Sequence, residues 1–387
     1  MAKVLAVVGT RPEATKMAPV ILALRRREPS LQVKVALTGQ HREMGRQGLA
    51  VFGLTPDHDL DIMEPKQALA ETFCRAMMGL VRLYREERPD LVLVQGDTVS
   101  CLAGALGAFY ERIPVGHVEA GLRTGDPCNP FPEEVNRKAV ATATTLHFAP
   151  TVRAQQALLQ EGYPASNVFL TGNTAVDAVQ MLAQRQQEPE PAAQSALEAC
   201  AGHKMVLVEL HRRENWGEPL RSLCRALRRL VSEQKEAFVV FSVHPNPVVG
   251  EMVRGELGAV ERVLLLTPPD YPSFLRLMKE CYFILTDSGG IQEEAPSLRK
   301  PVLVARVRTE RPEGVEAGLA RLVGTNEGEV LNALRQLLKD RATYEAMTKG
   351  VNPYGDGRAG ERIAQVVEYR LGLRAGPPEQ FHPGEMT

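Results

Sequence analysis

Short apolar runs alternate with longer amphipathic segments along the first half of the chain. The apolar runs are VLAVVG (4–9), VKVALTG (33–39), LVLVQGD (91–97), VGHVEAG (115–121), LHFAP (146–150) and VFLTG (168–172). Segments with helical periodicity, such as residues 68–87, separate them. Strands that are apolar along their whole length are typical of a parallel sheet covered by helices on both faces. The alternation therefore predicts a doubly wound α/β domain.

The second half repeats this alternation after a polar, proline-bearing stretch at residues 183–194. Its apolar runs are at 205–211, 238–245, 262–268, 282–287, 301–306 and 321–325. We therefore predict two Rossmann-like parallel-sheet domains facing a cleft, the architecture of the B-type glycosyltransferases. The predicted parts are an N-terminal domain at 1–173, a C-terminal nucleotide-binding domain at 174–359, a helix at 360–373 that could pack back on the first domain, and a flexible tail at 374–387.

Composition narrows the class of protein. The 387 residues include 46 Lys plus Arg and 47 Asp plus Glu, and this balance argues against a nucleic-acid-binding protein. No apolar run approaches the roughly 20 residues that span a bilayer, and the first run lacks the pattern of a signal peptide. The six cysteines are scattered without a C-x-x-C pair, which indicates reduced thiols and no zinc site. We expect a cytoplasmic protein without a metal centre.

The first strand-to-helix turn, GTRPEATKMAP (9–19), carries cations in place of a dinucleotide fingerprint. Neither G-x-G-x-x-G nor the P-loop pattern occurs in the chain, so no nicotinamide or other cofactor is expected. Arg11 and Lys16 stand at the start of the following helix, where cations and free N–H groups suit a phosphate. A solvated basic helix start is the plainer alternative.

A second phosphate-binding pattern follows the strand at 282–287. Ser288, Gly289 and Gly290 precede a helix, and glycines let backbone N–H groups approach an oxyanion closely. Glu294, within the first two turns of that helix, could accept hydrogen bonds from a pair of sugar hydroxyls. A glycine turn that merely fits the crossover is the alternative.

Carboxylates also stand at strand ends. Asp97 and Glu119 each close an apolar strand, and charged groups there point toward the ligand crevice of an open α/β sheet. Glu133 and Glu134 follow Pro132, so one of them could simply complement the dipole of a helix start. Several carboxylates around a sugar would suit proton abstraction and return on opposite faces.

A cationic cluster follows the first strand of the second half. His211, Arg212 and Arg213 are compactly placed for a diphosphate, with Arg308 and Arg311 further along. His41 and His244 also stand at strand ends, with a weaker case. The residues together describe a site for a nucleotide-diphosphate sugar.

The quoted segments occur in an order that resembles a known family. The segments GTRPEATKMAP, TGQHREM, QGDT, HVEAGLRTGD, FPEEVNR, TGNTAVD, HRREN, VHPNP, LTDSGGIQEEAPSLRKPVLV, TERPE and RLVGT span residues 9 to 325. They are similar to the signature segments of bacterial non-hydrolysing UDP-N-acetylglucosamine 2-epimerases. The resemblance implies a homodimer that interconverts UDP-GlcNAc and UDP-ManNAc without NAD or metal. UDP leaves by anti elimination, giving 2-acetamidoglucal, and then adds back.

The resemblance also assigns roles to individual positions. It implies catalytic roles for Asp97, Glu119, Glu133 and His211, the last as a diphosphate contact. Substrate-binding positions are Arg11, Lys16, Phe274 beside uracil, Ser288, Gly289, Gly290, Glu294 and Arg311. A second UDP-GlcNAc, acting as an activator, would contact Gln40, His41, Glu43, Lys66, Arg213 and His244.

Several positions depart from the usual form of this family. Glu209 and Leu210 stand where relatives commonly have small or hydroxyl residues, and Pro269 where they often have Gln. Glu43 and Lys66 replace the Gln and Arg of many activated relatives, which predicts a weakened activator site. The alternatives are a UDP-sugar glycosyltransferase on the same fold and an epimerase of a modified UDP-hexosamine. A hydrolysing epimerase or a non-catalytic sensor fits less well.

Overall fold

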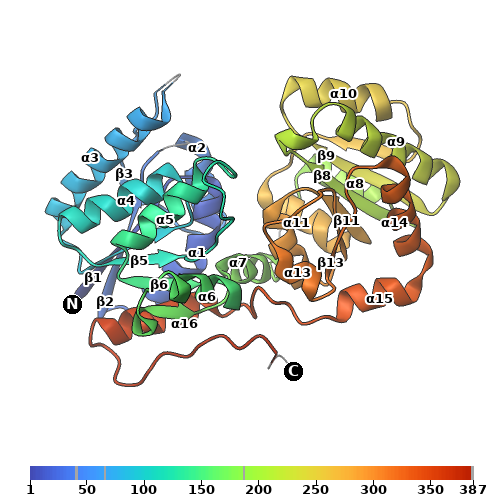
Figure 1. Cartoon of the computed structure of the whole chain (residues 1–387). Coiled ribbons are helices and arrows are strands. Elements are labelled where there is room, and N and C mark those ends of the chain that lie inside the picture. Colours follow the sequence, from blue (N-terminus) through green and yellow to red (C-terminus); the bar gives the residue numbers. More distant parts are fainter. Residues whose placement is uncertain (40–41, 65–66, 186–187, 385–387) are drawn as a thin grey trace. The chain divides into compact units, whose positions relative to one another are not determined.

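The chain folds into two compact units, which are coloured along the sequence in Figure 1. The computed structural model describes residues 1–39, 42–64, 67–185 and 188–384. Unit 1 comprises Met1–Ala178 and Tyr354–Thr387, and unit 2 comprises Val179–Pro353. The sequence places these boundaries after residue 173 and before residue 360, whereas unit 1 extends to Ala178 and resumes at Tyr354. No helix in the described ranges is long and apolar enough to cross a membrane.

Unit 1 is built on a parallel sheet, as the uniformly apolar runs predict. Within the described residues the strand order is β3-β2-β1-β4-β5-β6-β7. The strands are β1 (Ala2–Val8), β2 (Leu31–Leu37), β3 (His58–Asp59), β4 (Leu91–Gln95), β5 (Val115–Val118), β6 (Leu146–Ala149) and β7 (Val168–Leu170). Every residue of β4, β5 and β6 is buried, because helices cover both faces of the sheet.

The helices of unit 1 start where the sequence supplies a capping side chain. Thr10, Thr98 and Thr151 each accept a hydrogen bond from the first turn of the helix that follows. The helices are α1 (Arg11–Arg25), α2 (Arg42–Ala50), α3 (Leu69–Glu87), α4 (Val99–Tyr110), α5 (Glu133–Ala143), α6 (Val152–Gln160), the 3-10 turn η1 (Ala165–Asn167) and α16 (Ala359–Arg370). The helix α7 (Thr174–Ala183) begins in unit 1 and ends in unit 2. These caps fix the turns that carry the functional residues.

The last helix returns to unit 1, as the sequence suggested. Asp177 accepts hydrogen bonds from the backbone N–H groups of Ala359, at 3.1 Å, and Gly360, at 2.8 Å. A Cβ added at Gly360 would lie 2.8 Å from the backbone of Pro19, so glycine is required for α16 to approach α1. Arg27, just beyond the end of α1, pairs with Glu361 at the start of α16.

The segment after α16 differs from the flexible tail that its composition suggests. Phe381 is 1% exposed, and its N–H donates to the carbonyl of Leu170 at 2.8 Å. Arg362 lies over the Phe381 ring and pairs with Glu379. A single buried aromatic side chain thus anchors a segment that is otherwise rich in glycine and proline.

Unit 2 repeats the design with a smaller sheet. Among its described residues the strand order is β10-β9-β8-β11-β12-β13, all parallel. The strands are β8 (Lys204–Leu210), β9 (Ala237–Val243), β10 (Val263–Leu266), β11 (Phe283–Thr286), β12 (Val302–Val304) and β13 (Ala320–Leu322). The helices are α8 (Pro191–Ala199), η2 (Arg213–Asn215), α9 (Glu218–Glu233), α10 (Pro247–Leu257), α11 (Tyr271–Glu280), α12 (Gly289–Glu294), η3 (Ala295–Leu298), α13 (Pro312–Glu316), α14 (Glu327–Lys339) and α15 (Arg341–Lys349). In both units the strand ends carry the polar residues singled out above.

Candidate functional site

Buried Glu13 shapes the first strand-to-helix turn. Its carboxylate accepts hydrogen bonds from the backbone N–H groups of Gly9, at 3.0 Å, and Thr10, at 2.7 Å, and from the Thr98 hydroxyl at 2.7 Å. Burial raises the pKa of Glu13 to about 7, although these hydrogen bonds lower it. Glu13 thereby ties the turn after β1 to the turn after β4, and it leaves Arg11 exposed on the first turn of α1.

Lys16 lies against a carboxylate. Its ammonium is 2.7 Å from the carboxylate of Glu119, which also accepts a hydrogen bond from the Gln95 amide. Glu119 follows β5 with φ of 67°, an unusual backbone conformation for a residue other than glycine. The strained backbone and the two partners hold this carboxylate in a fixed position beyond the strand end.

Asp97, which follows β4, pairs with a residue that the sequence reading missed. The Arg137 guanidinium is 2.6 Å from the Asp97 carboxylate and is itself only 7% exposed. The Asn136 amide donates to the Asp97 carbonyl at 2.8 Å. The sequence did contain a signal for these partners: the FPEEVNR segment carries an asparagine and an arginine one turn beyond its glutamates. They attach α5 to the end of β4.

The adjacent glutamates at the start of α5 have separate tasks. Glu134 is fully buried and accepts hydrogen bonds from the backbone N–H groups of Thr124, at 3.0 Å, and Gly125, at 3.1 Å. Burial alone raises the pKa of Glu134, but these bonds and the charge of Arg137 bring it below its ordinary value. Glu133 instead keeps one buried carboxylate oxygen without a hydrogen-bond partner among the described residues. Glu134 holds the loop, whereas this oxygen of Glu133 does not contribute a hydrogen bond to it.

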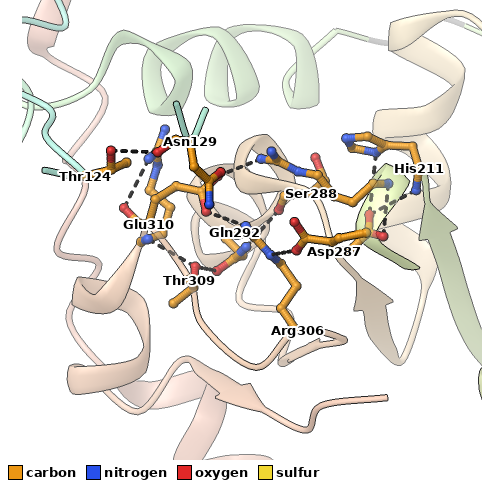
Figure 2. Close-up of polar contacts among 12 residues, drawn as sticks. Thr124, Asn129, His211, Asp287, Ser288, Gln292, Arg306, Thr309 and Glu310 are labelled. Carbon is orange, nitrogen blue, oxygen red and sulfur yellow. Dashed lines mark hydrogen bonds and ion pairs between the residues drawn. The ribbon is translucent and has the colours of Figure 1, made fainter. Parts of the chain in front are cut away.

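In unit 2, buried Asp287 joins the ends of two strands, as Figure 2 shows. Its side chain is 0% exposed and accepts from the N–H groups of His211, at 3.0 Å, and Arg212, at 3.1 Å, and from the Asn215 amide at 2.7 Å. The segment after β8 is therefore fixed against the segment after β11. Asp287 serves the geometry of the site and not its ligand.

His211 sits in an acidic environment on this frame. Its Nδ1 is 2.7 Å from one oxygen of Glu209, whose other oxygen accepts from the Thr286 hydroxyl at 3.2 Å. Donor atoms of Glu209, His211 and Asp287 lie within 4.8 Å of one another, but these hydrogen bonds already use the two carboxylates. The cluster is a hydrogen-bonded group that links the end of β8 to the end of β11.

The turn before α12 is open, as its glycines suggest. Ser288 is the N-cap residue of α12 but makes no side-chain cap, so its hydroxyl does not cover the first turn. A Cβ added at Gly290 would meet nothing nearer than the Ser288 Oγ at 3.8 Å, and one at Gly289 nothing nearer than Glu310 at 3.6 Å. Such an uncovered helix start suits an anion.

Ion pairs organise the arginines beyond β12. Glu310 accepts from Arg212 at 2.6 Å and also pairs with Arg306, which contacts Glu214 at 2.8 Å (Figure 2). Arg311 is only 8% exposed and pairs with buried Glu293. The sequence predicts Arg311 as a ligand contact, but it gave no indication of the acidic neighbours Glu293 and Glu310. The pairs show that this loop is held rigidly by its own charges.

The remaining predicted residues are scattered over the structure. Phe274 in α11 and Glu294 at the end of α12 are half-buried, Arg213 is exposed in η2, and the His244 ring lies 6.3 Å from that of Trp216. Glu43 lies in α2. Gln40, His41 and Lys66 lie outside the described residues.

A family model described as UDP-N-acetylglucosamine 2-epimerase matches residues 23–368, nearly the whole chain. The chain belongs to this epimerase family. The Bacillus subtilis UDP-N-acetylglucosamine 2-epimerase is 47% identical over 379 residues, which cover 98% of each protein. The family assignment makes the chain an isomerase.

Solved structures of epimerases agree in fold. A Neisseria meningitidis UDP-GlcNAc 2-epimerase bound to UDP-GlcNAc superposes with a TM-score of 0.87 at 41% identity, covering 96% of this chain and 100% of that one. A Staphylococcus aureus protein, solved as an MnaA–UDP co-structure, gives 0.90 at 44% identity and covers 99% and 100%. The epimerase therefore has the B-type glycosyltransferase fold that its sequence predicts.

The division of labour in α5 can be tested by stability. We expect Glu134→Gln to destabilise the epimerase by about 1–3 kcal/mol, because it weakens two backbone hydrogen bonds and a buried ion pair. Glu133→Gln should leave the melting temperature unchanged or raise it, because the carboxylate oxygen that it neutralises is buried without a partner. Calorimetric melting of both variants checks this, and equal losses would contradict the assignment.

Proposed function

We propose that the protein interconverts UDP-N-acetylglucosamine and UDP-N-acetylmannosamine, in a homodimer located in the cytoplasm. Family membership supports the substrate, since relatives of known structure are bound to UDP-GlcNAc and UDP. The observation that carries the chemistry is the contrast between Glu133 and Glu134, since only Glu133 keeps a carboxylate oxygen free of structural hydrogen bonds. The free cysteines, four of them buried, support a reducing compartment.

The proposed route is anti elimination followed by re-addition. A carboxylate takes the proton from C2 while the C1–O bond breaks and its electron pair leaves with UDP, giving 2-acetamidoglucal. A proton then returns to C2 from the opposite face as UDP attacks C1. Asp97, Glu119 and Glu133 are the proposed proton-transfer residues, because two faces require two groups. No hydride moves in this route, so it uses no nicotinamide.

The leaving group must be stabilised because the C2 proton is not acidic. We assign this task to Arg11, His211 and Arg311, together with the uncovered start of α12 at Ser288–Gly290. Glu294 is assigned to the ribose and Phe274 to the uracil. Lys16 lies on Glu119, so we assign it to holding that carboxylate ionised as well as to the phosphate side.

The reaction is tested by proton NMR in D2O with UDP-GlcNAc as the substrate. We expect UDP-ManNAc to appear and deuterium to enter C2, since the proton lost to a carboxylate exchanges with solvent before return. Asp97→Asn, Glu119→Gln and Glu133→Gln should each lower turnover by about 100-fold or more. Glu111→Gln, which neutralises a surface carboxylate paired with Arg85, is the matched control and should keep full turnover.

Two outcomes would contradict the elimination mechanism. Full retention of the C2 proton would exclude exchange through a carboxylate. Transfer of the sugar to an acceptor without epimerisation would favour the glycosyltransferase alternative. A modified UDP-hexosamine as the better substrate would keep the mechanism and change only the specificity.

The paired helices α3 and α4 offer a surface for the proposed homodimer. These helices pack on each other, and four large apolar side chains on them are at least 49% exposed: Leu69, Met78, Phe109 and Tyr110. Burying such side chains is favourable, and in a two-fold dimer each copy would contribute the same residues. We therefore assign the dimer contact to the exposed apolar residues of α3 and α4.

Oligomeric state tests the dimer contact. The double variant Met78→Glu/Phe109→Glu should be monomeric in light scattering, because it would bury charges in the interface, while the unmodified chain is dimeric. Leu159→Glu introduces the same charge at an exposed apolar residue on α6 and should stay dimeric. A dimeric double variant would place the contact elsewhere.

A second UDP-GlcNAc is proposed as an activator. Gln40, His41, Arg213 and His244 supply polar groups for it, while Glu43 and Lys66 weaken the site by charge and by loss of a bidentate arginine. Initial rates from pure UDP-ManNAc should be low, and trace UDP-GlcNAc should raise them. An unchanged, linear progress curve without a lag would show that these residues do not form an activator site.

A further inference from the structure

Glu209 and His211 form a carboxylate–imidazole pair at the end of β8. Successive residues of a strand alternate in direction, so Glu209 and His211 emerge on the same side, one at the end of the strand and one just beyond it. Their side chains meet at 2.7 Å between Glu209 Oε1 and His211 Nδ1. Both are only partly covered, with 21% and 34% of the side chains exposed.

The pair is held from both sides. The second oxygen of Glu209 accepts from the Thr286 hydroxyl on β11, and the backbone N–H of His211 donates to buried Asp287. Glu209 therefore cannot swing away without losing two hydrogen bonds. The ring of His211 is fixed through Nδ1, which leaves Nε2 as the nitrogen that a ligand can reach.

We propose that Glu209 is a positioning residue that orients the imidazole of His211 and keeps it in the doubly protonated form, so that Nε2 is a hydrogen-bond donor toward the diphosphate. The inference rests on the proposed function only in assigning the diphosphate as the ligand of His211. A neutral imidazole that donates Nδ1–H to Glu209 would present a lone pair at Nε2, which repels an anion. The imidazolium carries N–H groups on both nitrogens and can bind Glu209 and a phosphoryl oxygen together.

The charges around His211 favour the imidazolium. The charged groups that face the ring among the described residues are Glu209, Asp287 and Arg212. Burial lowers the pKa of His211, and Arg212 lowers it slightly, but Glu209 and Asp287 outweigh both and raise it above the ordinary value. His211 is therefore doubly protonated at pH values below the ordinary histidine pKa. It loses this second proton, and with it the Nε2 donor, only as the pH rises through its raised pKa.

A competing effect has the opposite sign. Glu209 is an anion near a proposed anion site, so its direct repulsion would weaken UDP binding at every pH. Removal of Glu209 would then strengthen binding uniformly. The two effects differ in pH dependence, which makes them separable.

The test compares Glu209→Gln with the unmodified chain. Gln can still accept from Nδ1–H but carries no charge, and the exposed Glu218→Gln serves as a charge-matched control away from His211. Long-range 1H–15N NMR of the imidazole should show the pKa of His211 lowered by about one unit or more in Glu209→Gln only. UDP affinity by calorimetry should fall by up to about tenfold at a pH between the two pKa values that the NMR titrations give, and should not fall at a pH below both of them, where both rings are charged.

The outcomes are distinct. An affinity loss that is equal at both pH values would reduce Glu209 to a structural link between β8 and β11 and overturn the proposal. Tighter UDP binding at both pH values would show that repulsion dominates, with the same consequence. In a His211→Asn background, Glu209→Gln should lose its pH-dependent effect. Neither readout requires turnover, so a failure of the epimerase assignment would be seen separately, as absence of C2 exchange.

Discussion

Burial of both parallel sheets on both faces forces the polar chemistry of this chain to the strand ends. The residues of β4, β5 and β6, and those of β9 and β11, are buried along their whole length. A charge inside such a strand would have no water and no partner. These five strands contain no Asp, Glu, Lys or Arg, and Asp97, Glu119 and Asp287 stand where the chain leaves the sheet. Parallel strands deliver those ends to one edge.

At these strand ends, the carboxylates fall into two groups according to their partners. Glu13, Glu134 and Asp287 are buried, and their carboxylate oxygens accept hydrogen bonds mainly from backbone N–H groups. Each one joins two loops that are distant in sequence, so it fixes geometry. Asp97 and Glu119 are instead held by the side chains of cations or amides. The acids bound by backbone groups fix the loops, and those bound by side chains are the ones proposed to transfer protons.

The fold and the placement of polar residues at strand ends could be predicted from the sequence, because both follow from the periodicity of apolar residues. It named Asp97, Glu119 and His211 correctly as strand-end residues, which the structure confirms. It did not find the partners of these groups, such as Arg137, because partners come from helices that approach from elsewhere in the chain. It also did not anticipate that Phe381 anchors the last segment, since an isolated aromatic in a glycine- and proline-rich stretch has no periodic signal.

Unit 2 is inserted into unit 1, since residues before and after it complete the same fold. Asp177 binds the start of α16, and Gly360 fills the space beside Pro19, so unit 1 needs the last stretch of chain for its own packing. During synthesis on a ribosome, the first 178 residues emerge early but lack their final helix. Unit 2 is contiguous and can complete itself first. The face of α1 then stays uncovered until α16 (Ala359–Arg370) has been synthesised.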